Sequence, residues 1–172
     1  MSLATLCTIA YCEDFLKQHR WSENWDDLTD DEKSDVITNA SQVIITWAKF
    51  PDPKDDSIEY KYVPSIAADG TPVGGEVPAD TDEIKYITEI PEWLMQACCY
   101  EVIYFLDLDS DPARPFPLGI LGLIKDGSDT FDHEYEPPLF SYMARKILEN
   151  NGAEVDDPME GNSWARRIFI DI

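Results

Sequence analysis

The sequence predicts a mainly α-helical fold: a small bundle of about four helices with an inserted long β-hairpin arm, a second short hairpin and an extended C-terminal tail. Three observations lead to this prediction. The stretch from Ile90 to Leu108 is the longest run with hardly a charge in a very acidic chain. Two earlier segments repeat apolar residues at helical spacing. After Phe50, prolines and an alternating pattern replace the helical one.

The apolar stretch is predicted to be a buried helix at the centre of the fold. Pro91 suits the first helical turn, and Glu92 suits the positive end of the helix dipole. The stretch is nearly as long as the roughly 20 residues that cross a bilayer. Glu92, Gln96 and Glu101 interrupt it, however, and no belt of Lys or Arg flanks it. We therefore interpret it as a core helix and expect no membrane partner.

A first helix is predicted from Ile9 to about His19, with Thr8 as its N-cap. Apolar residues at positions 9, 12, 15 and 16 fall on one face of this helix. The following link, from Trp21 to Trp25, carries two indoles that are expected to cover the end of the core.

The second helix is predicted from Asp30 to about Lys49. Thr29 and Glu32 have the spacing of a capping box, in which each side chain accepts a hydrogen bond from the other residue's backbone. The buried face is expected to contain Val36, Ile37, Ala40, Val43, Ile44 and Trp47. The carboxylates between Asp26 and Asp35 are explained by capping and solvation rather than by a metal site.

Two strands, Ile58–Val63 and Ile84–Thr88, are predicted from their alternating pattern. We expect them to pair as a hairpin. The long span between them is low in large apolar residues and has turn signals at Asp69-Gly70 and Gly74-Gly75. A loop of that length in a compact domain is usually either functional or disordered until a partner orders it, and a projecting β-hairpin arm is favoured.

The segment after the central helix begins like a calcium loop at Asp107. The EF-hand pattern needs glycine at its sixth position and glutamate at its twelfth, where this chain has Pro112 and Leu118. Calcium is therefore rejected. The short second hairpin is expected within residues 118–135, and the last helix within 139–148.

The predicted domain is residues 1–152, with the arm inserted at 58–88, and residues 153–172 form the extended tail. The end of the tail is apolar, aromatic and locally basic, which is typical of a docking peptide on an acidic protein. The alternative is a terminal strand that folds back onto the hairpins of its own chain. The sequence leaves both interpretations open.

The charge is −22, from 13 basic and 35 acidic residues. Such a surface repels phosphate backbones and anionic membranes, so ordinary wrapping of DNA is not expected. The simplest explanation of this charge is a well-solvated acidic surface. A more specific explanation is a surface past which DNA slides without sticking.

The four cysteines, Cys7, Cys12, Cys98 and Cys99, match no zinc-binding spacing. All lie in apolar, helix-like sequence, where unpaired cysteine behaves as a small core residue. We therefore predict no metal and no cofactor, in a protein made in a reducing cytosol. The first residues have neither the basic nor the apolar region of a secretory signal, so export is not expected.

No pattern predicts catalysis. Only His19 and His133 are available as neutral-pH bases, and neither lies in a nucleophile motif. Phosphate-binding, Gly-x-Ser-x-Gly and zinc-protease motifs are absent from the sequence. The chain is therefore not expected to be an enzyme.

The order of elements resembles the head-to-tail connector proteins of tailed bacteriophages, also called adaptor or head-completion proteins. The resemblance covers roughly residues 8–150 and is a pattern of helices and anchor residues, not of invariant chemistry. It consists of Ala10-Tyr11-x-x-x-Phe15-Leu16, Trp25, Leu28-Thr29-x-x-x-Lys33, Ala40 and Ile44 on a long helix, an interrupted strand region, Ile90-Pro91 opening an apolar helix, and a closing Pro-Pro-Leu helix.

This resemblance implies a virion protein of the neck, assembled in the host cytoplasm. Its copies would form a ring, commonly of about twelve, that binds the portal, supports the tail and extends the DNA channel without sequence-specific DNA binding. The implied portal-docking residues are Trp164, Arg166, Arg167, Ile168, Phe169 and Ile170. The implied ring or tail contacts are Ile58, Tyr60, Tyr62, Ile84 and Tyr86. The chain departs from the family pattern in its longer arm and in the tail beyond Asn150.

A ring would multiply the negative charge, and a channel lined with carboxylates would shorten the residence of passing DNA. Two other functions stay open. A replication accessory protein that binds single-stranded DNA needs a basic groove with stacking aromatics, for which only Arg166 and Arg167 beside Trp164 and Phe169 are candidates. An acidic DNA mimic that inhibits a basic protein would also explain the charge. The sequence gives neither the ring stoichiometry, nor the tail type, nor which acidic residues face the channel.

Overall fold

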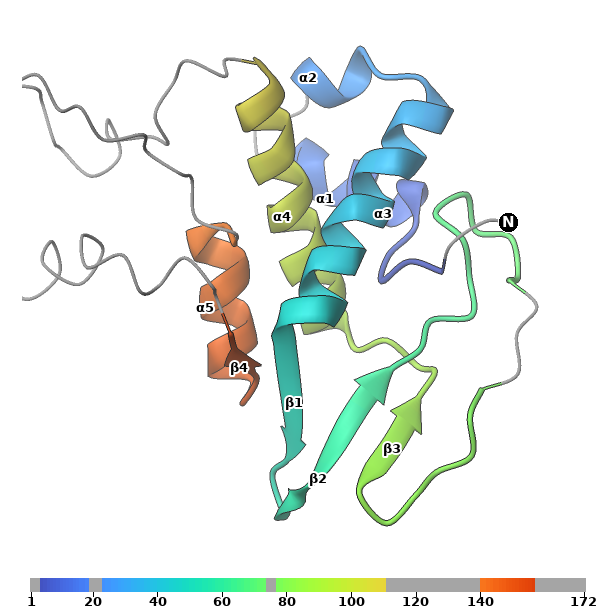
Figure 1. Ribbon diagram of the computed structural model, residues 1–172. Helices are drawn as coiled ribbons and strands as arrows, with labels where there is room; N and C mark the ends of the chain where they lie inside the picture. Colours follow the sequence, from blue (N-terminus) through green and yellow to red (C-terminus); the bar gives the residue numbers. More distant parts are fainter. Residues whose placement is uncertain (1–3, 19–22, 74–76, 111–139, 157–172) are drawn as a thin grey trace, which may run out of the picture.

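Helix α4 (Glu92–Ser110) lies among the other helices, as its apolar sequence predicts (Figure 1). A computed structural model describes residues 4–18, 23–73, 77–110 and 140–156. In it α4 contacts α1 (Ile9–Gln18), α2 (Glu23–Asp26), α3 (Asp30–Trp47) and α5 (Tyr142–Asn150). Leu94, Ala97, Cys98, Cys99 and Val102 on α4 are fully buried. The prediction of a central core helix is confirmed, and no helix in the described ranges has the length and apolarity to cross a membrane.

α1 and α3 also begin where local sequence signals place them, whereas α2 lies in a stretch predicted as a link and the last helix begins later than the expected residue 139. Thr29 and Glu32 form the predicted capping box at the start of α3, with the Thr29 N–H donating to Glu32 Oε2 over 2.8 Å. The last helix begins at Tyr142, with Ser141 as its N-cap. The Ser141 N–H donates over 3.0 Å to Glu101, a fully buried carboxylate on α4. This bond ties α5 to α4 and satisfies part of a carboxylate that is costly to bury alone.

The strands form one mixed sheet in the order β3-β2-β1-β4. β1 (Ala48–Asp52) follows α3 without a loop and pairs antiparallel with β2 (Asp55–Tyr62). β3 (Ile84–Ile87) pairs parallel with β2, with Glu59 opposite Ile84 and Tyr62 opposite Ile87. β4 (Glu154–Val155) pairs antiparallel with the start of β1.

The predicted fold class, mainly α with a hairpin arm, was wrong. The interpretable residues are 49% helical and 19% strand, and the fold is α+β. Both strands of the expected arm exist, but they run parallel and cannot form a hairpin. A parallel pair needs a connection of a dozen or more residues, and the long span after β2 supplies it. That span returns the chain to the start of β2 instead of projecting from the domain.

Part of this connection is anchored to the helical core. Ala67 and Ala68 are buried, and Gly70, with φ of 85°, forms the turn that follows. The Thr5 N–H donates to Ile66 O over 3.0 Å, and the Ile9 N–H donates to Ala68 O over 2.7 Å. The residues expected at the far part of an arm therefore pack beside the N-terminal segment.

Two strands were missed. The sequence predicts that α3 continues to Lys49, whereas β1 already begins at Ala48, and Pro51 lies in this strand beside a shift of register. Glu154 and Val155 were assigned to an extended tail but pair with β1. The two interpretations of the apolar end of the tail stay open, because that end lies outside the described residues. The second predicted hairpin, 118–135, and the rest of the tail, 157–172, lie outside the described residues.

Candidate functional site

The predicted ring or tail contacts lie together on two neighbouring strands. Ile58, Tyr60 and Tyr62 belong to β2, and Ile84 and Tyr86 to β3. All five are half-buried. Their places in a sheet, rather than on an arm, mean that some of them already have partners within the fold.

Tyr62 is the clearest case of such internal use. Its ring meets Phe50 edge-on with centroids 5.0 Å apart, and it meets Trp93 of α4 with centroids 6.2 Å apart. Burial raises the pKa of Tyr62. These rings join the sheet to the central helix, so Tyr62 acts as a packing residue.

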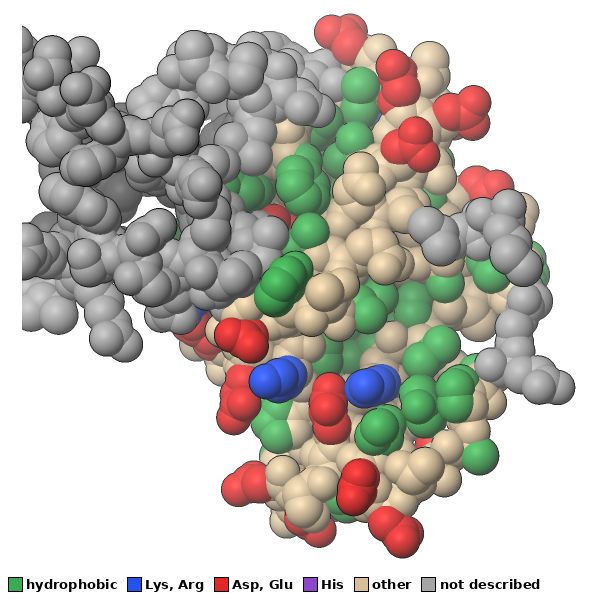
Figure 2. Space-filling view, in the orientation of Figure 1, with side chains coloured by type: hydrophobic (Ala, Val, Ile, Leu, Met, Phe, Trp, Pro, Cys, Tyr) green, Lys and Arg blue, Asp and Glu red, His purple; other side chains and the backbone are tan. Residues whose placement is uncertain are grey.

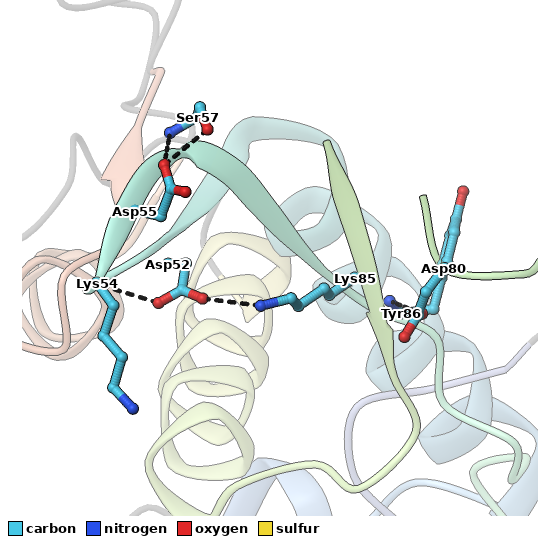
Figure 3. A network of polar contacts seen from close by, with 7 residues as sticks. All are labelled: Asp52, Lys54, Asp55, Ser57, Asp80, Lys85 and Tyr86. Carbon is cyan, nitrogen blue, oxygen red and sulfur yellow. Dashed lines mark hydrogen bonds and ion pairs between the residues drawn. The ribbon is translucent and has the colours of Figure 1, made fainter. Parts of the chain in front are cut away.

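The outer edge of β3 is closed by the turn that precedes it. The Tyr86 N–H donates to Asp80 Oδ1 over 2.9 Å (Figure 3). The Ile84 N–H donates to Thr81 Oγ1 over 3.0 Å. Ile84 O accepts from the Thr81 N–H over 2.9 Å. Since these backbone groups are taken, a second chain cannot add a strand here without displacing the turn. Contacts through the predicted residues would have to use side chains.

Asp52 at the end of β1 is the centre of a polar network (Figure 3). It is only 4% exposed and accepts hydrogen bonds from the Lys54 N–H over 2.8 Å and from Lys85 Nζ over 3.2 Å. The Lys54 N–H, the Tyr60 hydroxyl and Lys85 lower the pKa of Asp52, and Asp52 in turn raises the pKa of Lys85. Because Asp52 is ionised at neutral pH and its oxygens already accept these hydrogen bonds, it cannot act as a general acid. The network instead holds the β1–β2 turn in place.

Exposed carboxylates gather at two opposite ends of the described structure (Figures 1 and 2). One group lies at the α2–α3 end and includes Asp26, Asp27 and Asp35; the other lies at the tip of the sheet and includes Asp56, Asp82 and Glu83. Several basic side chains are engaged by carboxylates, including Lys33 with Glu13 at 3.0 Å and Arg145 with Glu149 at 2.7 Å. The described surface is therefore dominated by negative charge.

The four cysteines meet in one buried cluster, which the sequence did not predict. The Sγ atoms of Cys7 and Cys12 lie 3.3 Å apart, those of Cys12 and Cys99 3.2 Å, and those of Cys7 and Cys98 3.5 Å. Each side chain is at most 1% exposed. Contacts with Cys7 and Cys99 lower the pKa of Cys12 to about 5, and contact with Cys12 raises the pKa of both of these neighbours.

Beside this cluster is a pocket of about 240 Å³ between the N-terminal segment, the β2–β3 connection and the start of α4. Cys7 lines it together with Leu6, Thr8, Tyr11, Pro64, Ser65, Ile66, Thr88, Ile90 and Met95. Tyr11 is the main polar side chain, and burial raises its pKa to about 12. The mostly apolar wall of this pocket therefore borders the sulfur cluster at Cys7.

Several anchor residues of the connector resemblance are core residues, while Ala10 and Thr29 are exposed. Leu16, Trp25, Ala40 and Ile44 are at most 1% exposed and belong to one hydrophobic core. Lys33 Nζ lies 5.3 Å from the centre of the Trp25 ring, in the geometry of a cation–π contact. The resemblance thus describes how the helices pack and does not mark a chemical site.

The predicted portal-docking residues lie outside the described ranges: Trp164, Arg166, Arg167, Ile168, Phe169 and Ile170. So do His19 and His133, to which no catalytic role was assigned. Comparison with known proteins adds no family. The chain matches no protein-family model, no curated protein and no solved structure. The functional argument therefore depends on the charge and geometry of the chain itself.

Proposed function

We propose that this protein is a structural subunit of a tailed bacteriophage particle, which forms a ring in the neck between portal and tail. The ring surrounds the channel through which the genome passes, and its partners are further copies of itself, the portal and the next neck or tail component. The observation that carries the proposal is the net charge of −22 on a small, folded domain.

The charge suits a channel wall better than a nucleic-acid-binding surface. Carboxylates repel the DNA backbone, and a ring of copies multiplies that repulsion over the short distances of a channel. Three basic residues of the described part of the chain, Lys33, Lys85 and Arg145, are paired with its own carboxylates, and the residues expected for single-strand binding, Arg166 and Arg167, lie outside that part.

The packing of the anchor residues gives separate support. Trp25 and Lys33, together with Glu13, join α2, α3 and α1 at one end of the core. Trp25 and Lys33 are among the residues on which the connector resemblance depends, and their packing is compatible with the helical subunit that it implies.

Copy number in the particle tests the proposal directly. Quantitative peptide mass spectrometry of purified particles of the source phage, normalised to the portal, is expected to give a value close to that of the portal. Absence from the particle would end the connector proposal. Major tail and capsid proteins serve as controls, since their copy numbers must come out far higher.

Charge reversal tests the role of the acidic surface. One variant replaces Asp26, Asp27 and Asp35 by lysine, and a matched variant replaces Asp56, Asp82 and Glu83. Because the two groups lie at opposite ends, we expect one variant to slow DNA ejection and the other to leave it unchanged. Normal infectivity of both variants, at normal incorporation, would count against a low-friction channel wall.

A further inference from the structure

The convergence of all the cysteines is the starting point. The chain has four, and they come from three segments: Cys7 before α1, Cys12 within α1, and Cys98 with Cys99 on α4. Buried cysteines that only fill space have no reason to share one spot, because their contacts with any aliphatic neighbour are as good. Here the sulfurs of Cys7, Cys12 and Cys99 all lie within 4.8 Å of one another.

The spacing of these sulfurs is close to that of a metal–thiolate site. In a tetrahedral zinc site with bonds of about 2.3 Å, neighbouring sulfurs lie about 3.8 Å apart. Within the group of Cys7, Cys12 and Cys99, two sulfur pairs are 3.2 and 3.3 Å apart, so an outward shift of about half an ångström gives the spacing of three zinc ligands. A disulfide, in contrast, requires sulfurs about 2.05 Å apart.

The surroundings favour a soft metal ion. The polar neighbours that the structure gives these sulfurs are other cysteines and Ser41, whose Oγ lies 3.4 Å from Cys98 Sγ. Ser41 is itself held in place, since it donates to Ile37 O over 2.7 Å and accepts from the Leu6 N–H over 2.9 Å. An all-sulfur donor set without carboxylate or imidazole selects zinc or a similarly thiophilic ion over calcium or magnesium.

We propose that Cys7, Cys12 and Cys99 bind one Zn²⁺ ion as thiolates, with the fourth position open to a ligand from outside these three residues. On binding, each coordinating S–H gives up its proton to solvent and the sulfur lone pair forms the bond to zinc, without any change of oxidation state. The dication balances thiolate charge that would otherwise be costly in the core. The ion clamps the N-terminal segment and α1 onto α4.

The pocket lies beside the site. Cys7 forms part of its wall but is buried, so an ion that enters there reaches the sulfurs only when this wall shifts. A structural metal site requires an entry path as well as suitable ligands. This inference does not rest on the proposed neck function, and either can fail without the other.

The first experiment measures metal in the full-length wild-type chain. The protein is purified without chelator from cells grown with zinc, dialysed against EDTA under native conditions, and analysed by plasma mass spectrometry. One zinc per chain is expected, released only when a mercurial reagent blocks the thiols. Refolding with Co²⁺ is expected to give thiolate-to-cobalt charge-transfer bands and the strong visible bands of a tetrahedral site.

Variants then assign the ligands. Cys12→Ser and Cys99→Ser are expected to lose the zinc and the cobalt charge-transfer bands. Ala97→Ser is the matched control, because it places the same hydroxyl at a fully buried position of α4 while it removes no sulfur. This control is expected to keep one zinc per chain. The serine variants could lose zinc simply because they fold poorly. The wild-type measurements need no variant, so they can still refute the proposal in that case.

Three results would overturn it. The first is wild-type protein that holds no zinc and gives no cobalt spectrum. The second is cobalt bound without charge-transfer bands, which would place the metal on surface carboxylates. The third is an intact mass lower by two hydrogens in protein purified under thiol-free conditions, which would show a disulfide within the cluster.

Discussion

The helical half and the sheet half of this protein are held together differently. Leu16, Ile44 and Leu94 of the helices are completely buried, whereas every residue of β3 is only half-buried. β2 likewise has no fully buried residue along its length. The helices therefore gain stability mainly from apolar burial, while the sheet beyond β1 depends on backbone pairing and on polar side chains at its turns.

The largest expected difference between the halves comes from one substitution made in each. Ile44→Ala on α3 is expected to lower the free energy of unfolding by about 2–5 kcal/mol, because it opens a cavity in a close-packed core. Ile84→Ala on β3 is expected to cost clearly less, because that side chain keeps contact with water in the folded state. Urea unfolding followed by circular dichroism measures both.

If Ile44→Ala and Ile84→Ala lowered the free energy of unfolding equally, the sheet would share the main core. The proposed difference between the helical half and the sheet half would then be wrong. Ile45→Ala is the control within α3. Its side chain is 36% exposed, one position along the same helix, so it reports the helix-propensity part of the change without the cavity.

A smaller difference is expected between the turn residues of the two halves. Thr29→Ala removes the cap of α3 and is expected to cost about 0.5–2 kcal/mol. Thr81→Ala removes the side chain that accepts from the Ile84 N–H, but water can replace it at this exposed edge. The same urea titration compares them; a larger loss for Thr81→Ala would reverse the order of the two halves.

The pH dependence of the sheet is a third test, made with Asp52→Ala. A carboxylate with a lowered folded pKa stabilises above its unfolded pKa of about 3.9 and loses that effect as the pH falls through the folded value. The wild type is therefore expected to melt at a higher temperature than the variant at pH 7, with the gap closing below about pH 4. A gap that stays constant down to pH 2 would mean that Asp52 acts through packing alone. The comparison uses differences between variants, so general relief of charge repulsion in acid cancels.

The smallest change in stability is expected for Asp80→Ala at the edge of β3. The Tyr86 N–H loses its acceptor, so its hydrogen exchange is expected to speed up while the amides of α4 stay protected. The uncovered edge is also expected to promote self-association at high concentration, measured by analytical ultracentrifugation. Asp69→Ala is the control, since Asp69 makes a similar turn contact with Thr71 away from the sheet edge. Unchanged exchange at Tyr86 would show that other groups close the edge.

The same division explains how much of the fold the sequence could predict. Helix starts are local: the Thr29–Glu32 box and the acidic first turn of α3 lie within a few residues, and the predicted start at Asp30 is the observed one. Strand direction is not local. Alternation identified β2 and β3, but it contains no information on which neighbour a strand takes or in which direction the pair runs. β1 was not predicted because α3 passes directly into it, with no turn signal in the sequence between them.

The candidate site was harder still to predict. Metal-site patterns are spacings along the chain, whereas Cys12 and Cys99 approach each other across the packing of α1 on α4. Helical periodicity placed Cys12 on a buried face, and apolar sequence indicated that the other cysteines are core residues, but neither placed the four opposite one another. The predicted contact residues on β2 and β3 do lie together, yet the turn that closes the β3 edge depends on a side-chain acceptor, Asp80, that no strand pattern includes.

The pairing of β4 with β1 has a consequence for synthesis of the chain on the ribosome. Ala48 leaves the exit tunnel long before its partner Val155 is made, so one edge of β1 remains open while the rest of the sheet assembles. The face of α4 that α5 covers is exposed over the same interval. The nascent chain therefore carries an unpaired strand edge beside an apolar helix face until translation has passed residue 155, and this is the period in which it most needs a chaperone.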